Sequence, residues 1–285
     1  MRPTKKQHFI PRVVLKQHIC RSIPAQPNRI FQYNKETGKE YLTGIDNICC
    51  AKYLYEIKES DGSINKKHLN KIEKHLSDIE GKLGKAIRNI RLDSFSDTDL
   101  AVIRFYTALQ IIRVPNILEL AKKLAKEMLD FDEYTAENFA KATGLLPGVI
   151  SRDESILFDG VLRKVCSKHL KIFTTQISLC INESNPVLPI VAVLGEATSD
   201  DTSYFFPITH NICIGLLSTD TFEGKIKIPI PDVYTRYLNS LAYIANGKNL
   251  YCSVSVKENM KSLFLKMEPI DTAKSHHGRQ CLCML

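Results

Sequence analysis

The stretch that decides the fold is residues 65–90, NKKHLNKIEKHLSDIEGKLGKAIRNI. Its apolar side chains recur every three or four positions, and polar or charged residues fill most of the others; the apolar residues are Leu69, Ile72, Leu76, Ile79, Leu83, Ile87 and Ile90. This spacing is typical of an amphipathic α-helix with one buried face. Gly81 and Gly84 each cost about 1 kcal/mol relative to alanine, and they would permit close packing by a neighbour. The sequence therefore predicts a long helix packed against other elements.

A second helix is predicted to follow the first. Ser96-Asp-Thr-Asp99 has the pattern of a helix cap, and apolar positions continue through Val102, Phe105, Leu109 and Ile112. Pro115 interrupts this helix, and residues 116–129 resume an apolar stripe. These helices are expected to pack as a bundle.

Strands are predicted on both sides of the bundle. Residues 29–33 and 39–43 flank Asn34-Lys-Glu-Thr-Gly38, a typical turn composition, which predicts a hairpin after a short opening helix. Further strands are predicted at 173–181, 187–194, 203–207, 211–217, 225–230 and 250–256, and further helices at 155–168, 231–245 and 257–267. The predicted class is α+β, with a helical N-terminal bundle and short hairpin packed on a mainly antiparallel C-terminal sheet.

The expected organisation is a basic, mainly helical region (1–130), a helical connector (131–170) and a strand-rich region (171–285), together forming one domain. Of the 285 residues, 44% are hydrophobic and 25% charged, which is typical of a globular protein. No apolar run approaches the roughly 20 residues that span a bilayer. Nine cysteines, an odd and scattered set, favour a reducing compartment. We therefore expect a cytoplasmic protein without a membrane partner.

Positive charge is concentrated in the first part of the chain. Residues 1–128 hold 24 Lys and Arg against 14 Asp and Glu, a net charge of +10, whereas residues 129–285 hold 15 against 17, a net charge of −2. A basic half indicates an anionic partner, of which nucleic acid is the commonest. The alternative is that these lysines are simply solvated.

The leading candidate site is the opening stretch Lys6-Gln-His-Phe-Ile-Pro-Arg12. Pro11 suits the first position of a helix, so Arg12 would lie in the first turn, where it opposes the helix dipole and gains most when an anion docks. The same field would keep His8 neutral near pH 7, able to accept a proton or bind a metal. Lys6 and Gln7 would add contacts to the anion. Alternatively, His8 and Arg12 make structural hydrogen bonds that anchor the N-terminus.

A second candidate set lies on the second helix. Tyr106, Gln110 and Arg113 fall at i, i+4 and i+7, so they share one face beside the apolar stripe. Arg113 offers a bidentate fork for phosphate or carboxylate, or else it forms a buried ion pair or binds open carbonyls at the helix end. Asn185, between two predicted strands, is a further candidate, or simply part of a structural turn.

Several of these segments resemble the uncharacterised domain-of-unknown-function family 4238. The stretch Lys6–Arg12 is similar to its opening motif, and the other similarities follow in order along nearly the whole chain: Arg29–Tyr33, Lys35–Gly38, Ile79-Glu80, Gln110–Pro115, Asn185–Val187, Phe206–Ile208 and Tyr237–Asn239. Where the family usually carries Ser-Asp-Asn-Pro, this chain has Glu183-Ser184-Asn185-Pro186. If that aspartate is catalytic in relatives, its loss at Ser184 would impair this copy unless Glu183 substitutes for it.

Three hypotheses for the function follow. The first is a nucleic-acid-directed protein, which could act as a metal-dependent nuclease or a toxin-like or defence effector. In it, His8, Arg12, Arg113 and Asn185 would form the catalytic site, Lys6, Gln7, Tyr106 and Gln110 would bind the anion, and a divalent metal would be the cofactor. The second is a non-catalytic binding or regulatory protein whose motifs are structural. The third is an enzyme acting on a small anionic substrate, which would need a deep pocket uniting His8, Arg12, Arg113 and Asn185.

Overall fold

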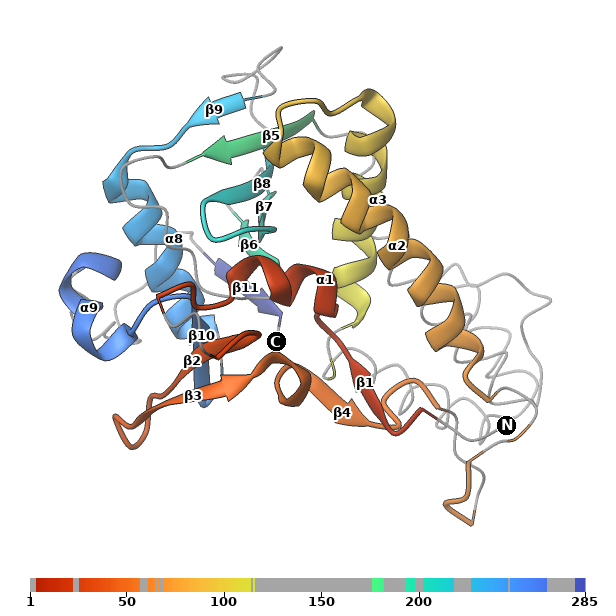
Figure 1. Ribbon diagram of the computed structural model, residues 1–285. Helices are drawn as coiled ribbons and strands as arrows, with labels where there is room; N and C mark the ends of the chain where they lie inside the picture. The colour runs from red at the N-terminus through yellow and green to blue at the C-terminus, as the bar shows by residue number, and fades with distance from the viewer. Residues whose placement is uncertain are drawn as a thin grey trace, which may run out of the picture.

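The computed structural model, shown in Figure 1, describes residues 4–22, 26–56, 61–64, 66, 69–113, 115, 176–181, 193–197, 202–217, 227–245, 247–265 and 280–284. The helices expected at 116–129 and 155–168 lie outside these residues, as do Ser184 and Asn185. In the described part of the chain, helices and largely antiparallel sheets occur together, and the class is α+β.

The chain opens with short elements that fold back on one another. In order they are β1 (Lys6–His8), α1 (Arg12–Leu15), the 3-10 helix η1 (Lys16–His18), β2 (Arg29–Asn34), β3 (Glu40–Gly44), the 3-10 helix η2 (Ile45–Asn47) and β4 (Cys50–Lys52). The predicted hairpin is confirmed: β2 and β3 pair antiparallel, and the Asn34 side chain accepts hydrogen bonds from the N–H groups of Glu36 and Thr37 in the turn. The antiparallel pairing of β1 with β4 was not evident from the sequence.

Two long helices follow, α2 (Lys71–Arg91) and α3 (Asp97–Arg113). Helix α2 begins later than position 65 because Asn70, at φ 55°, has a left-handed backbone that cannot continue a helix. The cap predicted for α3 is confirmed. The Asp99 carboxylate accepts from the Ser96 N–H at 3.0 Å, and the Asp99 N–H donates to Ser96 Oγ at 3.3 Å, so both exposed N–H groups are satisfied.

Gly84 lets α1 approach α2 closely. A Cβ at Gly84 would lie 2.9 Å from Cγ2 of Val13, whereas a Cβ at Gly81 would meet nothing within 4 Å. The close packing that the two glycines suggested is therefore confirmed at Gly84 and is absent at Gly81. In Figure 1, α2 runs along one side of the molecule, with α3 packed against it.

The largest sheet is built from the C-terminal part of the chain. Its strands are β5 (Gln176–Ile181), β6 (Val193–Ala197), β7 (Thr202–Pro207), β8 (Ile212–Leu217), β9 (Lys227–Pro229) and β11 (Gln280–Met284), in the order β11-β6-β7-β8-β5-β9. Its described pairs are antiparallel except for β5 with β9. Strand β11 was not predicted, because a short run after a polar tail becomes a strand only when the edge of β6 supplies its hydrogen bonds.

The last predicted strand belongs to a different sheet. Strand β10 (Asn249–Cys252) pairs with β2, so the N-terminal hairpin becomes a three-stranded sheet. The expected helices around it are present as α8 (Asp232–Ala245) and α9 (Val256–Leu263). Glu40 of β3 secures α9, because its carboxylate accepts hydrogen bonds from the N–H of Val256 and from Ser255 Oγ, both at 2.7 Å.

The helical region and the large sheet share one hydrophobic core. Its buried side chains come from α1, α2 and α3, represented by Leu15, Leu83 and Ile103, and also from the sheet, represented by Phe206 and Ile214. Burial of these apolar surfaces joins the two regions, although they are far apart in the sequence. Among the described residues, no helix has the length and apolar character needed to cross a membrane.

Candidate functional site

The opening strand places alternate side chains on opposite sides. Gln7 is fully buried, whereas Lys6 on one side of it is exposed and His8 on the other is half-buried. This alternation follows from the two-residue period of a strand, and the register with β4 fixes it, since Gln7 lies opposite Ala51. Gln7 thus faces the interior of the protein.

Both ends of the Gln7 amide are occupied. Its Nε2 donates to Glu56 Oε1 at 2.9 Å, and its Oε1 accepts from the Tyr55 N–H at 2.8 Å. The buried Glu56 carboxylate also accepts from the N–H of Asn70, just before α2. Gln7 therefore joins β1 to the segment after β4 and, through Glu56, to the start of α2.

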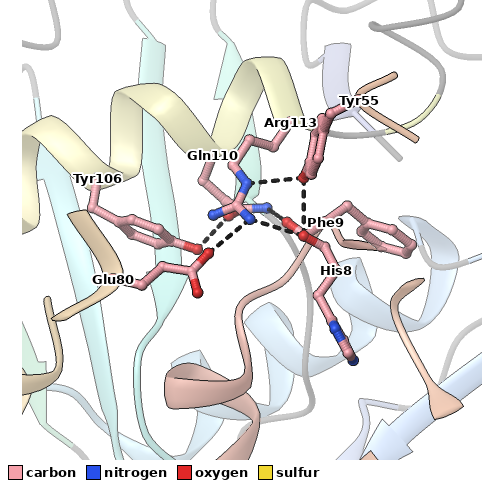
Figure 2. A network of polar contacts seen from close by, with 7 residues as sticks. All are labelled: His8, Phe9, Tyr55, Glu80, Tyr106, Gln110 and Arg113. Carbon is pink, nitrogen blue, oxygen red and sulfur yellow. Dashed lines mark hydrogen bonds and ion pairs between the residues drawn. The ribbon is translucent and has the colours of Figure 1, made fainter. Parts of the chain in front are cut away.

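Arg113, at the end of α3, occupies the centre of a buried polar network (Figure 2). Its side chain is 3% exposed; Nε donates to Tyr55 Oη at 3.1 Å, and Nη2 donates to the His8 carbonyl at 2.8 Å and to Glu80 Oε1 at 2.9 Å. Among the described residues, Nη1 has no hydrogen-bond partner. Burial alone would lower the pKa of Arg113, but the oxygens of Tyr106, Tyr55 and Glu80 outweigh it and raise that pKa. The guanidinium is thus held as an internal cation.

A carboxylate of α2 balances this cation. Glu80 pairs with Arg113 directly. Burial and repulsion from Glu80 raise the pKa of the nearby Glu73, while the charge of Arg113 acts in the opposite direction. The positive charge of Arg113 is therefore balanced inside the protein and offers little attraction to an external anion.

Tyr106, Gln110 and Arg113 share one face of α3, as their spacing predicted. Gln110 Nε2 donates to the Phe9 carbonyl at 2.6 Å, and the buried Tyr106 hydroxyl donates to Gln110 Oε1. The Tyr106 ring packs against Phe206 of β7, with centroids 5.5 Å apart, and burial raises its pKa well above the usual value. This face of α3 therefore binds the backbone of β1 and the residue after it.

His8 takes part in the network through its backbone. Its carbonyl accepts from Arg113 Nη2 and from the Tyr55 hydroxyl, the latter at 2.9 Å. Figure 2 shows the imidazole pointing away from Arg113; its Nε2 lies 3.4 Å from the Ile45 carbonyl. Burial lowers the pKa of His8, and the charges of Arg12 and Arg113 add to this effect. The ring is therefore neutral near pH 7.

Lys6 and Arg12 are exposed and both contact η2. Arg12 Nη2 lies 2.7 Å from Asp46 Oδ1, with the two side chains 56% and 59% exposed, and Lys6 Nζ donates to Asn47 Oδ1 at 2.6 Å. These surface contacts are separate from the buried bonds of Arg113.

The residues of this network fall within a recognised family. The family described as "Protein of unknown function (DUF4238)" matches residues 6–251. The chain belongs to this family. Neither the curated proteins nor the solved structures include a significant match to the chain. The matched range includes β1, the Ile79-Glu80 pair of α2 and the end of α3, which are segments whose sequences resemble the motifs of the family.

The structure thus brings together Gln7, Tyr106, Gln110, Arg113 and the His8 carbonyl, but it places the His8 ring, Arg12 and Lys6 elsewhere. Asn185 lies outside the described residues. The network also contains residues that were not predicted as site residues: Tyr55, Glu56, Glu80 and the Phe9 carbonyl. The resemblance of Ile79-Glu80 to the family pattern was the one available signal for Glu80. Within the described ranges, no three His, Cys, Asp or Glu side chains are grouped to hold a metal ion.

The exposed face of α2 has a different character from the network. Five of its exposed side chains are basic: Lys74, Lys82, Lys85, Arg88 and Arg91. On an ideal helix Lys74, Lys85 and Arg88, together with Asp78, lie on the side away from the buried apolar stripe, whereas Lys82 and Arg91 lie on its two flanks. Asp78 is the exposed acid of this helix, since Glu73 and Glu80 are half-buried towards Arg113. We call the five basic side chains the α2 basic face.

Proposed function

We propose that this protein binds nucleic acid without cleaving it, and that the family motif residues hold the fold together. The observation that carries the proposal is the α2 basic face, where five exposed cations stand beside the single exposed acid Asp78. Lys and Arg contacts to phosphate release condensed counterions, and this release supplies most of the affinity for nucleic acid without sequence preference. The proposal also includes a cytoplasmic location for the protein and the packing of its N-terminal helices as a bundle.

The buried network supports the structural role of the motifs. The side-chain amides of Gln7 and Gln110 and the Nε and Nη2 groups of Arg113 bond to groups of the protein itself, and Arg113 Nη1 is buried. A residue that receives a phosphate or a substrate needs a donor directed outward, and these side chains are buried. We therefore assign anion binding to the surface of α2 rather than to this network.

Filter binding tests the proposal with a labelled 30-nucleotide DNA, both single-stranded and annealed, from 50 to 200 mM salt. The test variant is Lys82→Glu/Lys85→Glu/Arg88→Glu. If each of the three cations contacts one phosphate, their loss lowers the slope of log affinity against log salt by about 2.7 for a duplex. Over this fourfold range of salt, the affinity of the parent should then fall about 40-fold more than that of the variant.

A matched control carries the same change of charge on another surface. Lys39 is exposed in the turn of the hairpin, and Lys257 and Lys261 are exposed on α9. The variant Lys39→Glu/Lys257→Glu/Lys261→Glu therefore also changes the net charge by −6. The control should retain most of the affinity and the salt slope of the parent. No retention of either DNA at 50 mM salt, or an equal loss in both triple variants, would remove the proposal.

A cleavage assay separates binding from catalysis. The full chain is incubated with the same DNA and Mg²⁺ or Mn²⁺, and the products are separated on a denaturing gel. We expect intact DNA. Cleavage that disappears in His8→Ala, while the variant keeps the melting temperature of the parent, would overturn the non-catalytic part of the proposal and restore the nuclease hypothesis.

A further inference from the structure

We infer that Cys50 is a site of thiol–disulfide exchange with small anionic disulfides, and that His8 takes the proton of its thiol. The observations behind this inference are the cross-strand placement of the two side chains and the pair of lysines beside them. The inference goes beyond the proposed function and does not depend on nucleic-acid binding.

Cys50 and His8 are neighbours across the two strands β1 and β4. The register places His8 directly opposite Cys50. The Phe9 N–H donates to the Cys49 carbonyl at 2.9 Å, so the next pair, His8 with Cys50, is a non-hydrogen-bonded pair of the ladder. In such pairs the Cα atoms are about 4.5 Å apart, and the two side chains on the shared face approach most closely.

Both side chains also contact the same short turn, η2. His8 Nε2 lies 3.4 Å from the Ile45 carbonyl, and Cys50 Sγ donates to the Asp46 carbonyl at 3.9 Å. These carbonyls are consecutive, so the imidazole and the thiol lie over one turn of the chain. Since a carbonyl can only accept a hydrogen bond, this contact puts the proton of the neutral ring on Nε2 and leaves Nδ1 as the basic nitrogen.

Cys50 differs from the other cysteines whose side chains the structure describes, because its thiol is partly exposed. The buried ones are Cys20, Cys49, Cys213 and Cys252. A buried cysteine behaves as a small apolar residue and is chemically inert, whereas a dissolved reagent can reach a thiol at the surface. Within the described residues, Cys50 is therefore the cysteine that a reagent meets in the folded protein.

The thiol of Cys50 needs a base in order to react. Burial raises its pKa, and the charge of Asp46 adds to this rise, while that of Lys6 opposes it. The thiolate is the nucleophile, so exchange is slow near pH 7 unless a neighbouring group accepts the proton. Burial keeps His8 neutral at this pH and able to accept it. The thiolate of a thiol with a high pKa is also the stronger nucleophile once it forms.

Two lysines give this surface its preference for anions. Lys6 and Lys52 are exposed, and the register places them opposite each other as the next pair on the face that carries His8 and Cys50. Like charges directly opposite each other in an antiparallel pair are destabilising. Lys6 Nζ donates to the neutral amide oxygen of Asn47 at 2.6 Å, which leaves the charge of the lysine uncancelled. A disulfide that carries carboxylates relieves this repulsion when it docks.

The exchange conserves atoms and charge. His8 Nδ1 takes the thiol proton, and Cys50 Sγ attacks one sulfur of the disulfide R–S–S–R. An S–S bond forms between Cys50 and one RS group, the original S–S bond breaks, and the second RS group leaves as a thiolate. That thiolate takes the proton back from His8, so the products are a mixed disulfide at Cys50 and one RSH. The disulfide itself is the oxidant of the step.

Timed modification of the full chain tests the inference. The parent, Cys50→Ser and His8→Gln are mixed with oxidised glutathione at pH 7.5 and low salt, and the remaining thiols are then blocked. Peptide mass spectrometry with fragmentation locates the adduct and separates Cys50 from Cys49. We expect Cys50 to react about tenfold or more faster than the buried Cys20. His8→Gln should slow this reaction about tenfold, and Cys50→Ser should lose the adduct.

The variant Lys6→Gln/Lys52→Gln tests the preference for anions. It should slow the reaction of Cys50 with oxidised glutathione about threefold or more, because two attracting charges are lost. Its reaction with 2-hydroxyethyl disulfide, which is uncharged, should stay within about twofold of the parent. The matched control Lys39→Gln/Lys257→Gln carries the same change of charge away from β1, and it should react as the parent does with both disulfides.

Unfolding cannot imitate these results, because an unfolded chain exposes its buried cysteines and reacts faster at all of them. Modification of Cys50 no faster than that of Cys20, or an unchanged rate in His8→Gln, would overturn the inference. An equal loss with both disulfides in Lys6→Gln/Lys52→Gln would overturn the anionic class of the reagent. None of these variants alters the α2 basic face, so a failure here is distinct from a failure of the proposed function.

Discussion

Replacing Arg113 with alanine is the most direct test of the structural role of the network. The change removes a guanidinium that is 3% exposed and leaves Tyr55, Glu80 and the His8 carbonyl without their shared donor. Breaking a buried ion pair by removing one partner costs about 3–5 kcal/mol. Because Glu80 is 26% exposed, water compensates for part of its loss, and the lower end of that range, about 3 kcal/mol, is expected.

Thermal unfolding followed by circular dichroism converts this loss into a shift. For a chain of 285 residues the entropy of unfolding is about 600 cal/mol/K, at about 2.1 cal/mol/K per residue. A loss of about 3 kcal/mol then lowers Tm by about 5 °C. Arg113→Lys should lower it nearly as much, since one ammonium group cannot reproduce the planar fork that reaches three acceptors.

Arg12→Ala is the matched control for this measurement. Arg12 forms an ion pair whose two side chains are 56% and 59% exposed, and such pairs contribute about 0.2–1 kcal/mol. Its Tm should fall by less than about 2 °C. If Arg113→Ala melts within 1 °C of the parent, or within error of Arg12→Ala, the network does not stabilise the fold and the structural role assigned to Arg113 is wrong. Loss of DNA binding in a fully stable Arg113→Ala would contradict it too.

Three further predictions concern stability. Gly81→Ala should raise the free energy of unfolding, measured by urea titration, by about 1 kcal/mol. Gly84→Ala should gain less or lose stability, because its Cβ would lie 2.9 Å from Cγ2 of Val13. Equal gains in the two variants would contradict the close approach of α1. Asp99→Ala should lower that free energy by about 1 kcal/mol by uncapping α3, and an unchanged urea midpoint would exclude this role. Burial lowers the pKa of His8 and His210, so the unfolded chain takes up protons near pH 6.5 before the native protein does. Stability should therefore fall as pH drops below about 6.5, and the fall should be smaller in His8→Gln/His210→Gln; identical urea midpoints for the parent at pH 7.5 and 5.5 would refute this.

Local patterns were enough to predict most of the described elements. The three-to-four spacing identified α2, the Ser96–Asp99 pattern identified the start of α3, and the turn at Asn34–Gly38 identified the hairpin. In each case the residues that determine the element are close together in the sequence. Strand β11 and the pairing of β10 with β2 were missed because their hydrogen-bond partners are remote in the chain. A strand that exists through a distant edge leaves little signal in its own residues.

The candidate residues show a similar limit. The i, i+4, i+7 spacing correctly placed Tyr106, Gln110 and Arg113 on one face of α3, but spacing does not specify what that face meets. It meets the backbone of residues 8 and 9, whose carbonyls carry no side-chain signature. His8 looked like a chemical group because of its imidazole, yet the atom that Arg113 binds is its carbonyl oxygen, which any residue would supply.

This distinction decides which substitutions are informative. His8→Ala keeps the carbonyl and removes only the ring, so it leaves the bonds from Arg113 and Tyr55 in place. Gln7→Ala removes the amide that holds Glu56 and the Tyr55 N–H, and it leaves a buried carboxylate short of one donor. If the opening motif is structural, Gln7→Ala must therefore destabilise the protein more than His8→Ala does. The reverse order, with a stable Gln7→Ala, would mean that the imidazole and not the buried amide is what the opening motif provides.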